Sequence, residues 1–230
     1  GFFTTIPIRG DVEVLRKNLW FFPLGGLIVG LFISAAAILE KHFLVTPVFV
    51  VLAYFFIEGI NHFDGLVDFG DAVFAPKNRK IEALKDTKIG AGGTAFALVY
   101  VLILFQDFTL ADVQDIIFSQ ILAKYSMLVA IIFSKPAWEG MASYMMRFAG
   151  KKDILLGSAI VALFMIIDTS IIECLAATLL ITFIVVKYSE KNFGGINGDV
   201  LGALNCIVFA TSLGIRVGIL PSVFSLLIIS

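Results

Sequence analysis

The segment from Glu58 to Asp71 carries four carboxylates and a histidine directly after the apolar run 43–57. If this segment is helical, Asp64, Asp68 and Asp71 recur at i, i+4 and i+7, and their side chains fall within an arc of about 60°. Charge placed beside lipid is costly and marks functional sites. The spacing suits a divalent cation that holds a diphosphate.

The carboxylates could instead form a solvated face of a cytoplasmic extension, or line an ion path in a transporter. A solvated face would usually carry lysines at i+4, but no lysine or arginine occurs between Glu58 and Lys77. The unbalanced carboxylates therefore favour a bound cation. Three roles are open for His62: a hydrogen-bonded interfacial residue, a support for a metal ligand, or a general base.

A second polar cluster spans residues 79–93 and ends in glycines that open the next apolar segment. Lysine ammonium groups and the backbone N–H groups of a glycine-rich helix start both suit phosphate oxygens. We expect Lys85, Asp86 and Lys88 to bind such a ligand. Arg79 and Lys80 are expected to be ordinary loop charges.

A third cluster contains Asn197, Asp199 and Asn205 among four glycines in residues 194–202. Asp199 is expected at or near a helix N-cap, where a carboxylate accepts backbone hydrogen bonds. The glycines would also permit close approach of a bulky ligand or a metal. Both interpretations of this cluster remain open.

Composition requires a membrane setting for these clusters. The chain is 59% hydrophobic, contains 23 phenylalanines and only 15% charged residues, and has a mean hydropathy of +0.99. A soluble globule of this composition would cover its surface with apolar side chains. The net charge of -1 gives no support for nucleic-acid binding. We expect an all-α, polytopic membrane bundle that forms a single catalytic domain over residues 1–230, with Cys174 and Cys206 as packing residues.

Apolar windows that could cross about 30 Å of hydrocarbon predict about seven spans, near residues 19–39, 43–57, 93–105, 117–133, 154–186 and 200–213. The stretch 154–186 is too long for one span and is expected to form two helices joined by a tight polar turn around Asp168. Residues 217–229 form an eighth short span or a re-entrant end. The segments 1–18, 58–92, 134–153 and 187–199 hold 14 of the 17 lysines and arginines. Because cytoplasmic loops are enriched in these residues, we expect a multi-pass protein of the cell membrane with its polar clusters facing the cytoplasm.

Three further expectations concern the N-terminal segment, a charged residue within a span, and the packing of the spans. Residues 1–18 are amphipathic and are expected to lie along the cytoplasmic interface rather than to form a cleavable signal peptide. Lys124 lies within a predicted span, and we expect it to face the interior of the bundle. The Gly26-x-x-x-Gly30 motif offers a small-residue face that could support a homodimer.

Four ordered blocks resemble the signatures of the cobalamin synthase family, the adenosylcobinamide-GDP ribazoletransferases. They are FFTTIP (2–7), HFDGLVDFGD (62–71), RKIEALKDTKIG (79–90) and GDVLGA (198–203). The resemblance implies an enzyme that joins adenosylcobinamide-GDP to α-ribazole or its 5′-phosphate and releases GMP, with Mg²⁺ as cofactor and the membrane lipid around it.

The resemblance also implies roles for the polar residues. The expected Mg²⁺ ligands are Glu58, Asp64, Asp68 and Asp71. Lys85 and Lys88 would hold phosphates, with Asp86, Asn197 and Asp199 also in the substrate site. His62 or one of the aspartates, Asp64 or Asp68, would take the proton of the attacking hydroxyl.

Three other classes remain as alternatives. A CDP-alcohol phosphotransferase also carries aspartates on membrane helices, but its pattern has Ala-Arg where this chain has Asp68-Phe69. An aromatic prenyltransferase would be expected to show two aspartate clusters, and Gly198-Asp199 is a poor second one. A cation or metabolite transporter would place its carboxylates near the middle of the membrane, whereas here they cluster at one edge.

Overall fold

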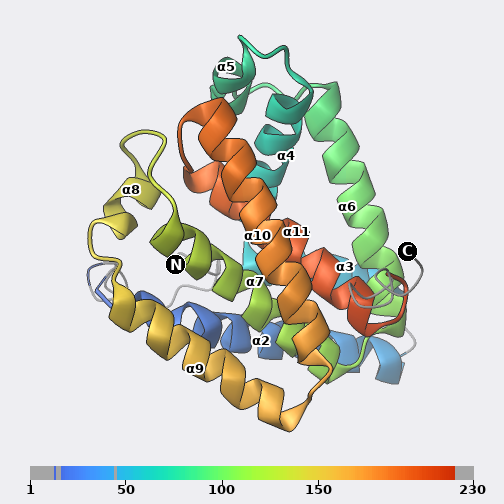
Figure 1. Ribbon diagram of the computed structural model, residues 1–230. Helices are drawn as coiled ribbons and strands as arrows, with labels where there is room; N and C mark the ends of the chain where they lie inside the picture. Colours follow the sequence, from blue (N-terminus) through green and yellow to red (C-terminus); the bar gives the residue numbers. More distant parts are fainter. Residues whose placement is uncertain (1–12, 14–16, 44–45, 221–230) are drawn as a thin grey trace, which may run out of the picture.

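The structure, a computed structural model, describes residue 13 and residues 17–43 and 46–220. The described part forms ten α-helices and one short 3-10 helix (Figure 1). In chain order these are η1 (Leu19–Phe21), α2 (Phe22–Phe43), α3 (Pro47–Glu58), α4 (Ile60–Phe74), α5 (Lys80–Lys85), α6 (Ala91–Leu110), α7 (Val113–Phe133), α8 (Met141–Met146), α9 (Lys151–Ile167), α10 (Ile171–Phe193) and α11 (Gly198–Arg216).

The prediction of an all-α, polytopic membrane bundle is confirmed, although the described part contains fewer spans than expected. Five helices are long and apolar enough to cross a membrane: Leu19–Glu40, α6, α7, α10 and α11. The bent pair α3 and α4 raises this number to six if it counts as one broken span. With 17 residues, α9 lies at the lower limit of span length. The segments expected near the two ends, 1–18 and 217–229, lie largely outside the described residues.

The span expected at residues 43–57 is wrong as a separate crossing. In the structure, α3 has 12 residues, which at 1.5 Å per residue reach only about 18 Å. After Glu58 the chain bends by 97° into α4. The bend occurs at Gly59, whose φ of 88° is accessible to glycine and strained for other residues. The carboxylate segment is therefore a helix in its own right, and its first carboxylate, Glu58, is separated from the others by the bend.

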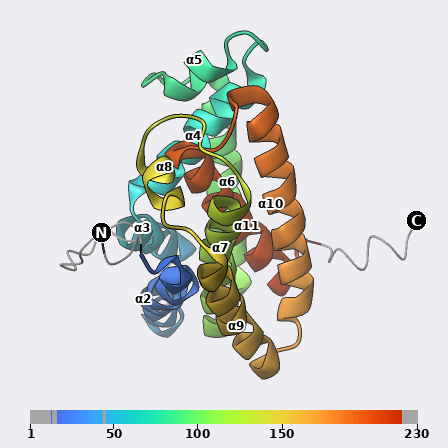
Figure 2. The same cartoon turned by 60° about the vertical axis from the view of Figure 1, so that its left-hand side comes forward.

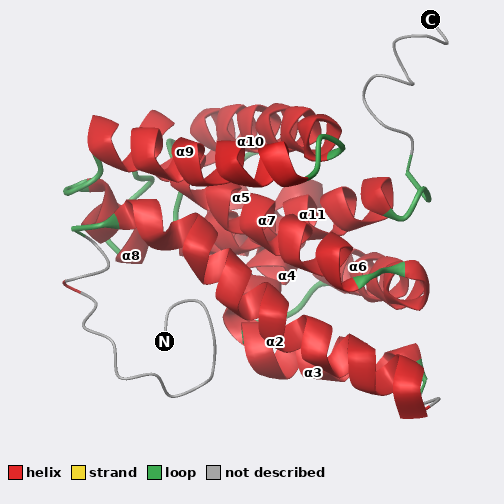
Figure 3. Ribbon diagram, turned by 90° about the horizontal axis from the view of Figure 1, so that it is seen from below, coloured by secondary structure: helices red, strands yellow, loops and turns green. Residues whose placement is uncertain are grey.

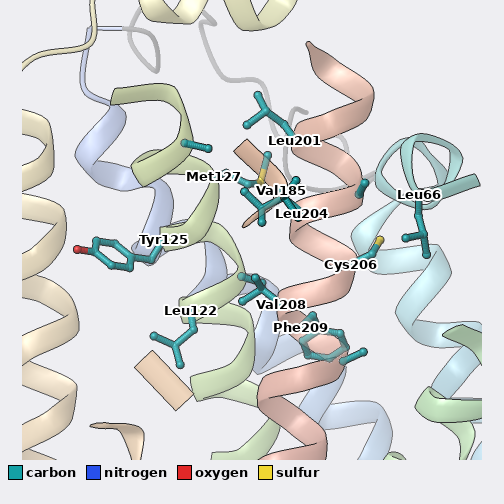
Figure 4. Close-up of a cluster of buried hydrophobic side chains, with 14 of the residues drawn as sticks. Leu66, Leu122, Tyr125, Met127, Val185, Leu201, Leu204, Cys206, Val208 and Phe209 are labelled. Carbon is teal, nitrogen blue, oxygen red and sulfur yellow. The ribbon is translucent and has the colours of Figure 1, made fainter. Parts of the chain in front are cut away.

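The centre of the bundle is formed by α7 and α11. Both are mostly buried. Helix α11 packs against α4, α7 and α10, and α7 packs also against α2 and α10; apolar side chains from α4, α7, α10 and α11 meet in this core (Figure 4). Seen from below, α7 and α11 lie between α9 and α10 on one side and α2 and α3 on the other (Figure 3). The polar turn expected within residues 154–186 is confirmed between α9 and α10. Both cysteines are buried free thiols, as expected of packing residues.

The Gly26-x-x-x-Gly30 face is used inside the chain. A Cβ placed on Gly26 would lie 2.4 Å from the carbonyl oxygen of Gln120, and one on Gly30 would lie 2.8 Å from the Cα of Ile117. The two glycines therefore allow α2 to pack closely along α7. This motif is occupied by an intramolecular contact and gives no support to a homodimer.

The polar segments gather at one end of the bundle. There α5 lies beside the C-terminal end of α4, the start of α6 and the α10–α11 connection, whereas the α9–α10 turn lies at the opposite end (Figures 1 and 2). The ammonium of Lys80 caps the C-terminal end of α4: it donates to the carbonyl oxygens of Ala72 and Val73. It also donates to the hydroxyl of Tyr188 on α10. Arg79 pairs with Glu82. Both cations therefore have local structural partners.

Candidate active site

The site is built on a close crossing of α4 and α11. A Cβ on Gly65 would lie 2.6 Å from the carbonyl oxygen of Asp199, and one on Gly202 would lie 3.0 Å from the Cα of His62. Side chains at these positions would push the two helices apart. The glycines of α11 that were expected to admit a ligand thus include one, Gly202, that admits a neighbouring helix. The crossing brings Asp199 next to the aspartates of α4.

Asp64 and Asp68 form the open carboxylate face of α4. Asp64 is exposed and Asp68 is half-buried, one turn further along the helix. Asp68 lies within electrostatic range of Asp64, Asp71, Asp86 and Asp199. Within the part of the chain that the structure describes, neither Asp64 nor Asp68 has a hydrogen-bond or ion-pair partner. Their mutual repulsion is therefore not balanced by a cation among the described residues.

Asp71 belongs to the same helix face but is engaged by α6. Its carboxylate accepts hydrogen bonds from the backbone N–H groups of Gly90 (2.7 Å) and Gly93 (2.8 Å). This is a cap on the start of α6, where a negative charge also complements the helix dipole. The N–H groups of these two glycines, expected to be available for phosphate, are thus occupied by a carboxylate of the chain. Asp71 therefore holds the start of α6 at the edge of the site, and its role as a metal ligand stays a prediction.

A small polar pocket of about 200 Å³ lies beside this cap. Its lining includes Asp71, Asp86, Lys88 and Gly90, together with the Arg79–Glu82 pair. The Asp86 carboxylate accepts a hydrogen bond of 3.1 Å from the backbone N–H of Lys88. The hydrogen bond from the Arg79 guanidinium lowers the pKa of Glu82. The pocket therefore contains Asp86 and Lys88, two of the three residues of the second polar cluster that were predicted to bind substrate.

The third, Lys85, lies over an aromatic ring. Its ammonium is 4.1 Å from the centroid of Trp138, a cation–π contact. The loop that carries Trp138 is held against the α10–α11 connection, because Ile196 donates to the carbonyl oxygen of Lys135 and Ala137 donates to that of Ile196, both at 2.9 Å. Gly195 permits this approach: a Cβ there would lie 2.3 Å from the same Lys135 oxygen.

Asn197 supplies the cap of α11. Its amide oxygen accepts from the N–H of Val200 at 3.0 Å, and its amide nitrogen donates to the Asp199 carboxylate at 2.6 Å. The N-cap is therefore Asn197, and Asp199 is the second residue of the helix, close to the expected position. These contacts orient the Asp199 carboxylate at the edge of the α4 aspartate face.

Glu58 and His62 lie in a separate, buried network. Oε1 of Glu58 accepts from Nδ1 of His62 (2.9 Å), from Nδ2 of Asn205 (2.8 Å) and from the ammonium of Lys124. The same ammonium donates to Oδ1 of Asn205 at 2.8 Å. All four residues are buried, which confirms that Lys124 faces the interior. His62 lies about 120–160° around α4 from Asp64 and Asp68 at 100° per residue, so the structure does not bring it to the carboxylate face.

The donor set suits Mg²⁺ only if few of its ligands come from the protein. Among the residues described, no group of three or more carboxylate, imidazole or thiol side chains is arranged to hold a metal ion. Mg²⁺ does not require such a cage, because it is commonly bound through one or two carboxylates, substrate phosphates and water. Asp64 and Asp68 meet this requirement as unpaired carboxylates one turn apart. The carboxylate of Glu58 is instead paired inside the bundle, and that of Asp71 caps α6.

The sequence analysis did not predict the contacts of three of these residues. Lys124 and Asn205 were visible as polar residues in apolar spans, but the sequence does not tell which helices face each other. Trp138 carried no signal beyond its aromatic character. The need of a buried lysine for a counter-ion was the one available clue to its pairing with Glu58.

Together, the fold and the site define a polytopic helical membrane protein with a carboxylate face at one end of its bundle, and no described residue neutralises that face. Residues 1–217 match the cobalamin-5-phosphate synthase family, and the chain belongs to this family. The resemblance found in the sequence blocks is thereby confirmed.

The relatives agree with this assignment. An adenosylcobinamide-GDP ribazoletransferase of Archaeoglobus fulgidus is 50% identical over 213 residues, covering 93% of this chain and 92% of that protein. A second protein of that name from the same organism is 46% identical over 214 residues, with coverages of 93% and 92%. One from Methanocella arvoryzae is 34% identical over 251 residues, with coverages of 96% and 94%. No solved structure matches the chain.

Proposed function

We propose that this chain is a membrane adenosylcobinamide-GDP ribazoletransferase. It joins adenosylcobinamide-GDP to α-ribazole or α-ribazole 5′-phosphate and releases GMP. The family match over residues 1–217 and relatives of this name at 50% and 46% identity support the activity. The relatives described above share one name, and no feature of the described residues favours a CDP-alcohol phosphotransferase, a prenyltransferase or a transporter.

The structural observation that carries the proposal is the pair Asp64 and Asp68 beside Asp199, since neither carboxylate of the pair has an ion-pair or hydrogen-bond partner among the described residues. The substrate contains a diphosphate, and the reaction breaks it. When bound by Asp64 and Asp68, Mg²⁺ would neutralise charge on the diphosphate oxygens. The ammonium groups of Lys85 and Lys88 bind phosphate oxygens at the rim of the same site, where Asp86 and the Asn197–Asp199 pair lie.

In the reaction, a hydroxyl oxygen of the ribazole attacks the phosphorus that carries the cobinamide. A new P–O bond forms, the P–O bond to GMP breaks, and GMP leaves with the electron pair. The hydroxyl proton passes to a carboxylate oxygen of Asp64 or Asp68. His62 is less suited to this step, because it is buried on another face of α4 and bound to Glu58. Positioning of the two substrates by the charged residues supplies most of the catalysis in such transfers.

The cell membrane is the proposed location, with the site on the cytoplasmic side. The support is the charge distribution: the loops at the end of the bundle that carries α5 are rich in lysine and arginine, as the positive-inside rule requires of cytoplasmic loops. This orientation would give the site access to GDP-activated and ribazole substrates made in the cytoplasm.

The test is GMP release from adenosylcobinamide-GDP by the purified protein in lipid, with a CDP-alcohol and a prenyl diphosphate as control substrates. Asp64→Asn and Asp68→Asn should each lower turnover by about 10²-fold or more, and should raise the Mg²⁺ concentration needed for half-maximal rate. Glu190→Gln is the matched control, because Glu190 pairs with Lys187 outside the site. Normal turnover of both asparagine variants at limiting Mg²⁺ would exclude the proposed metal site.

A further inference from the structure

We infer that Lys124 and Asn205 are positioning residues of this enzyme. They hold Glu58 at the bend between α3 and α4 and so fix α4, with its aspartates, against α11. The inference rests on the proposed function, because it concerns the rate of that same reaction. It assigns a role to a buried charge cluster that lies apart from the substrate-facing residues.

The network connects the α3–α4 bend with α7 and α11, whose relative positions determine the geometry of the site. Glu58 is the last residue of α3 and His62 is in the first turn of α4, so both flank the 97° bend. Lys124 comes from the middle of α7, and Asn205 comes from α11, six residues after Asp199. The bend is thereby tied to the two central helices of the bundle by hydrogen bonds of 2.8–2.9 Å and by the ion pair.

Stability alone does not account for this cluster. Burying two charges costs solvation energy that their attraction only partly returns, and apolar replacements of such pairs are often neutral or stabilising. Here the cost is larger, because Oε2 of Glu58 is buried and accepts no hydrogen bond from the residues that the structure describes. A fully apolar packing would also suit the surroundings, since α7 and α11 are otherwise built mainly from buried apolar side chains.

The cluster fixes the position of α4 along α11. Apolar side chains tolerate sliding of one helix along another, whereas three donors converging on one oxygen, Oε1 of Glu58, define a single register. That register decides how Gly65 meets Asp199, and therefore how far Asp64 and Asp68 lie from the carboxylate of α11. A shift of about 1 Å at a catalytic constellation can cost about 10²-fold in rate.

The deciding experiment separates folding from rate with four variants of the full chain in lipid. Lys124→Met leaves the Glu58 charge uncompensated, and we expect a lower midpoint of thermal unfolding together with a loss of about 10²-fold in kcat. Lys124→Arg keeps the charge and should stay within about tenfold of wild type. The double variant Glu58→Gln with Lys124→Met removes both charges. It should unfold near the wild-type temperature, yet keep a kcat at least about tenfold below wild type, with little change in KM for adenosylcobinamide-GDP.

Arg216→Met is the fourth variant and the matched control. This variant removes another cation whose side chain is well buried. Arg216 lies at the end of α11 and pairs with Asp115 and Asp168, at the end of the bundle opposite the candidate active site. The variant should lower the unfolding midpoint and leave kcat unchanged. A double variant that recovers both its unfolding midpoint and wild-type kcat would overturn the inference, because the pair would then be needed only for charge balance. If wild-type protein releases no GMP, the proposed function itself fails and the inference falls with it.

Discussion

Gly65 gives the sharpest test of the α4–α11 crossing. In the structure, a Cβ added at Gly65 would lie 2.6 Å from the Asp199 carbonyl oxygen and 2.9 Å from the Asp199 Cα. Ordinary contact begins at 3.4 Å, so Gly65→Ala must move α11 away from α4 by about 0.8 Å. Both atoms belong to backbone, which has no rotamer to relieve the overlap. The displacement therefore acts directly on the distance between Asp199 and the aspartates of α4.

The magnitude follows from two effects. Overpacking of this kind costs about 1–3 kcal/mol, which for a chain of this length corresponds to a fall of about 2–12 °C in Tm. A displacement approaching 1 Å at the catalytic carboxylates should lower kcat by about 10²-fold. Gly202→Ala meets His62 at 3.0 Å and requires a smaller movement, so its losses should be intermediate.

Gly198→Ala supplies the control on the same helix. It is the first residue of α11, and an added Cβ there meets no atom within 4 Å. We expect wild-type Tm and kcat for this variant. GMP release and thermal unfolding of the three variants in the same lipid should give the order Gly65, Gly202, Gly198 in decreasing severity. Equal effects of Gly65→Ala and Gly198→Ala on both quantities would refute the close crossing.

Two further predictions concern the ends of the bundle. Asp71→Asn weakens the cap of α6, so the free energy of unfolding should fall by about 1 kcal/mol, which is measured as a lower Tm. The loss of kcat should be far smaller than in Asp68→Asn. Equal losses of kcat in the two variants would instead make Asp71 a metal ligand. Hydrogen bonds from Ser170 and Arg216 lower the pKa of Asp168 below its usual 3.8, so the carboxylate stabilises the fold above that pH and this contribution is lost as the pH falls through the folded pKa. Asp168→Asn should therefore lower Tm by up to about 4 °C at pH 7. This difference should shrink as the pH falls below 3.8 and through the folded pKa; a difference that stays constant on acidification would contradict the argument.

The sequence determined much of the site because its signals were local. The i, i+4, i+7 spacing of Asp64, Asp68 and Asp71 would place three carboxylates on one face of a helix, and the structure forms this helix as α4. The polar residues around Asp168 predicted a turn between two helices, because backbone and charge cannot end in lipid without partners. In the same way, the apolar surroundings of Lys124 predicted an inward-facing ammonium.

What the sequence could not supply was which helix meets which. Gly202 was one of the glycines expected to admit a ligand, but the space beside it is filled by α4, as the space beside Gly65 is filled by α11. The glycines at 90–93 looked like a phosphate cradle, but Asp71 reaches two of their N–H groups first. Glu58 looked like the first member of a carboxylate run, until the bend at Gly59 turned it to face Lys124. Each of these outcomes depends on a contact between residues far apart in the chain.

The helix α4 thus has two chemically different sides, and the difference explains why its charges persist in an apolar chain. On the inner side, His62 and the preceding Glu58 are paired within the protein, and the Glu58 charge is balanced by Lys124. On the outer side, Asp64 and Asp68 repel each other and Asp199 without any cation from the described residues. The fold compensates the Glu58 carboxylate inside the bundle, whereas six and ten residues later two other carboxylates receive no compensating charge from the described residues. The second set is therefore available for charge brought from outside. A cation bound with a diphosphate brings that charge only when substrate is present.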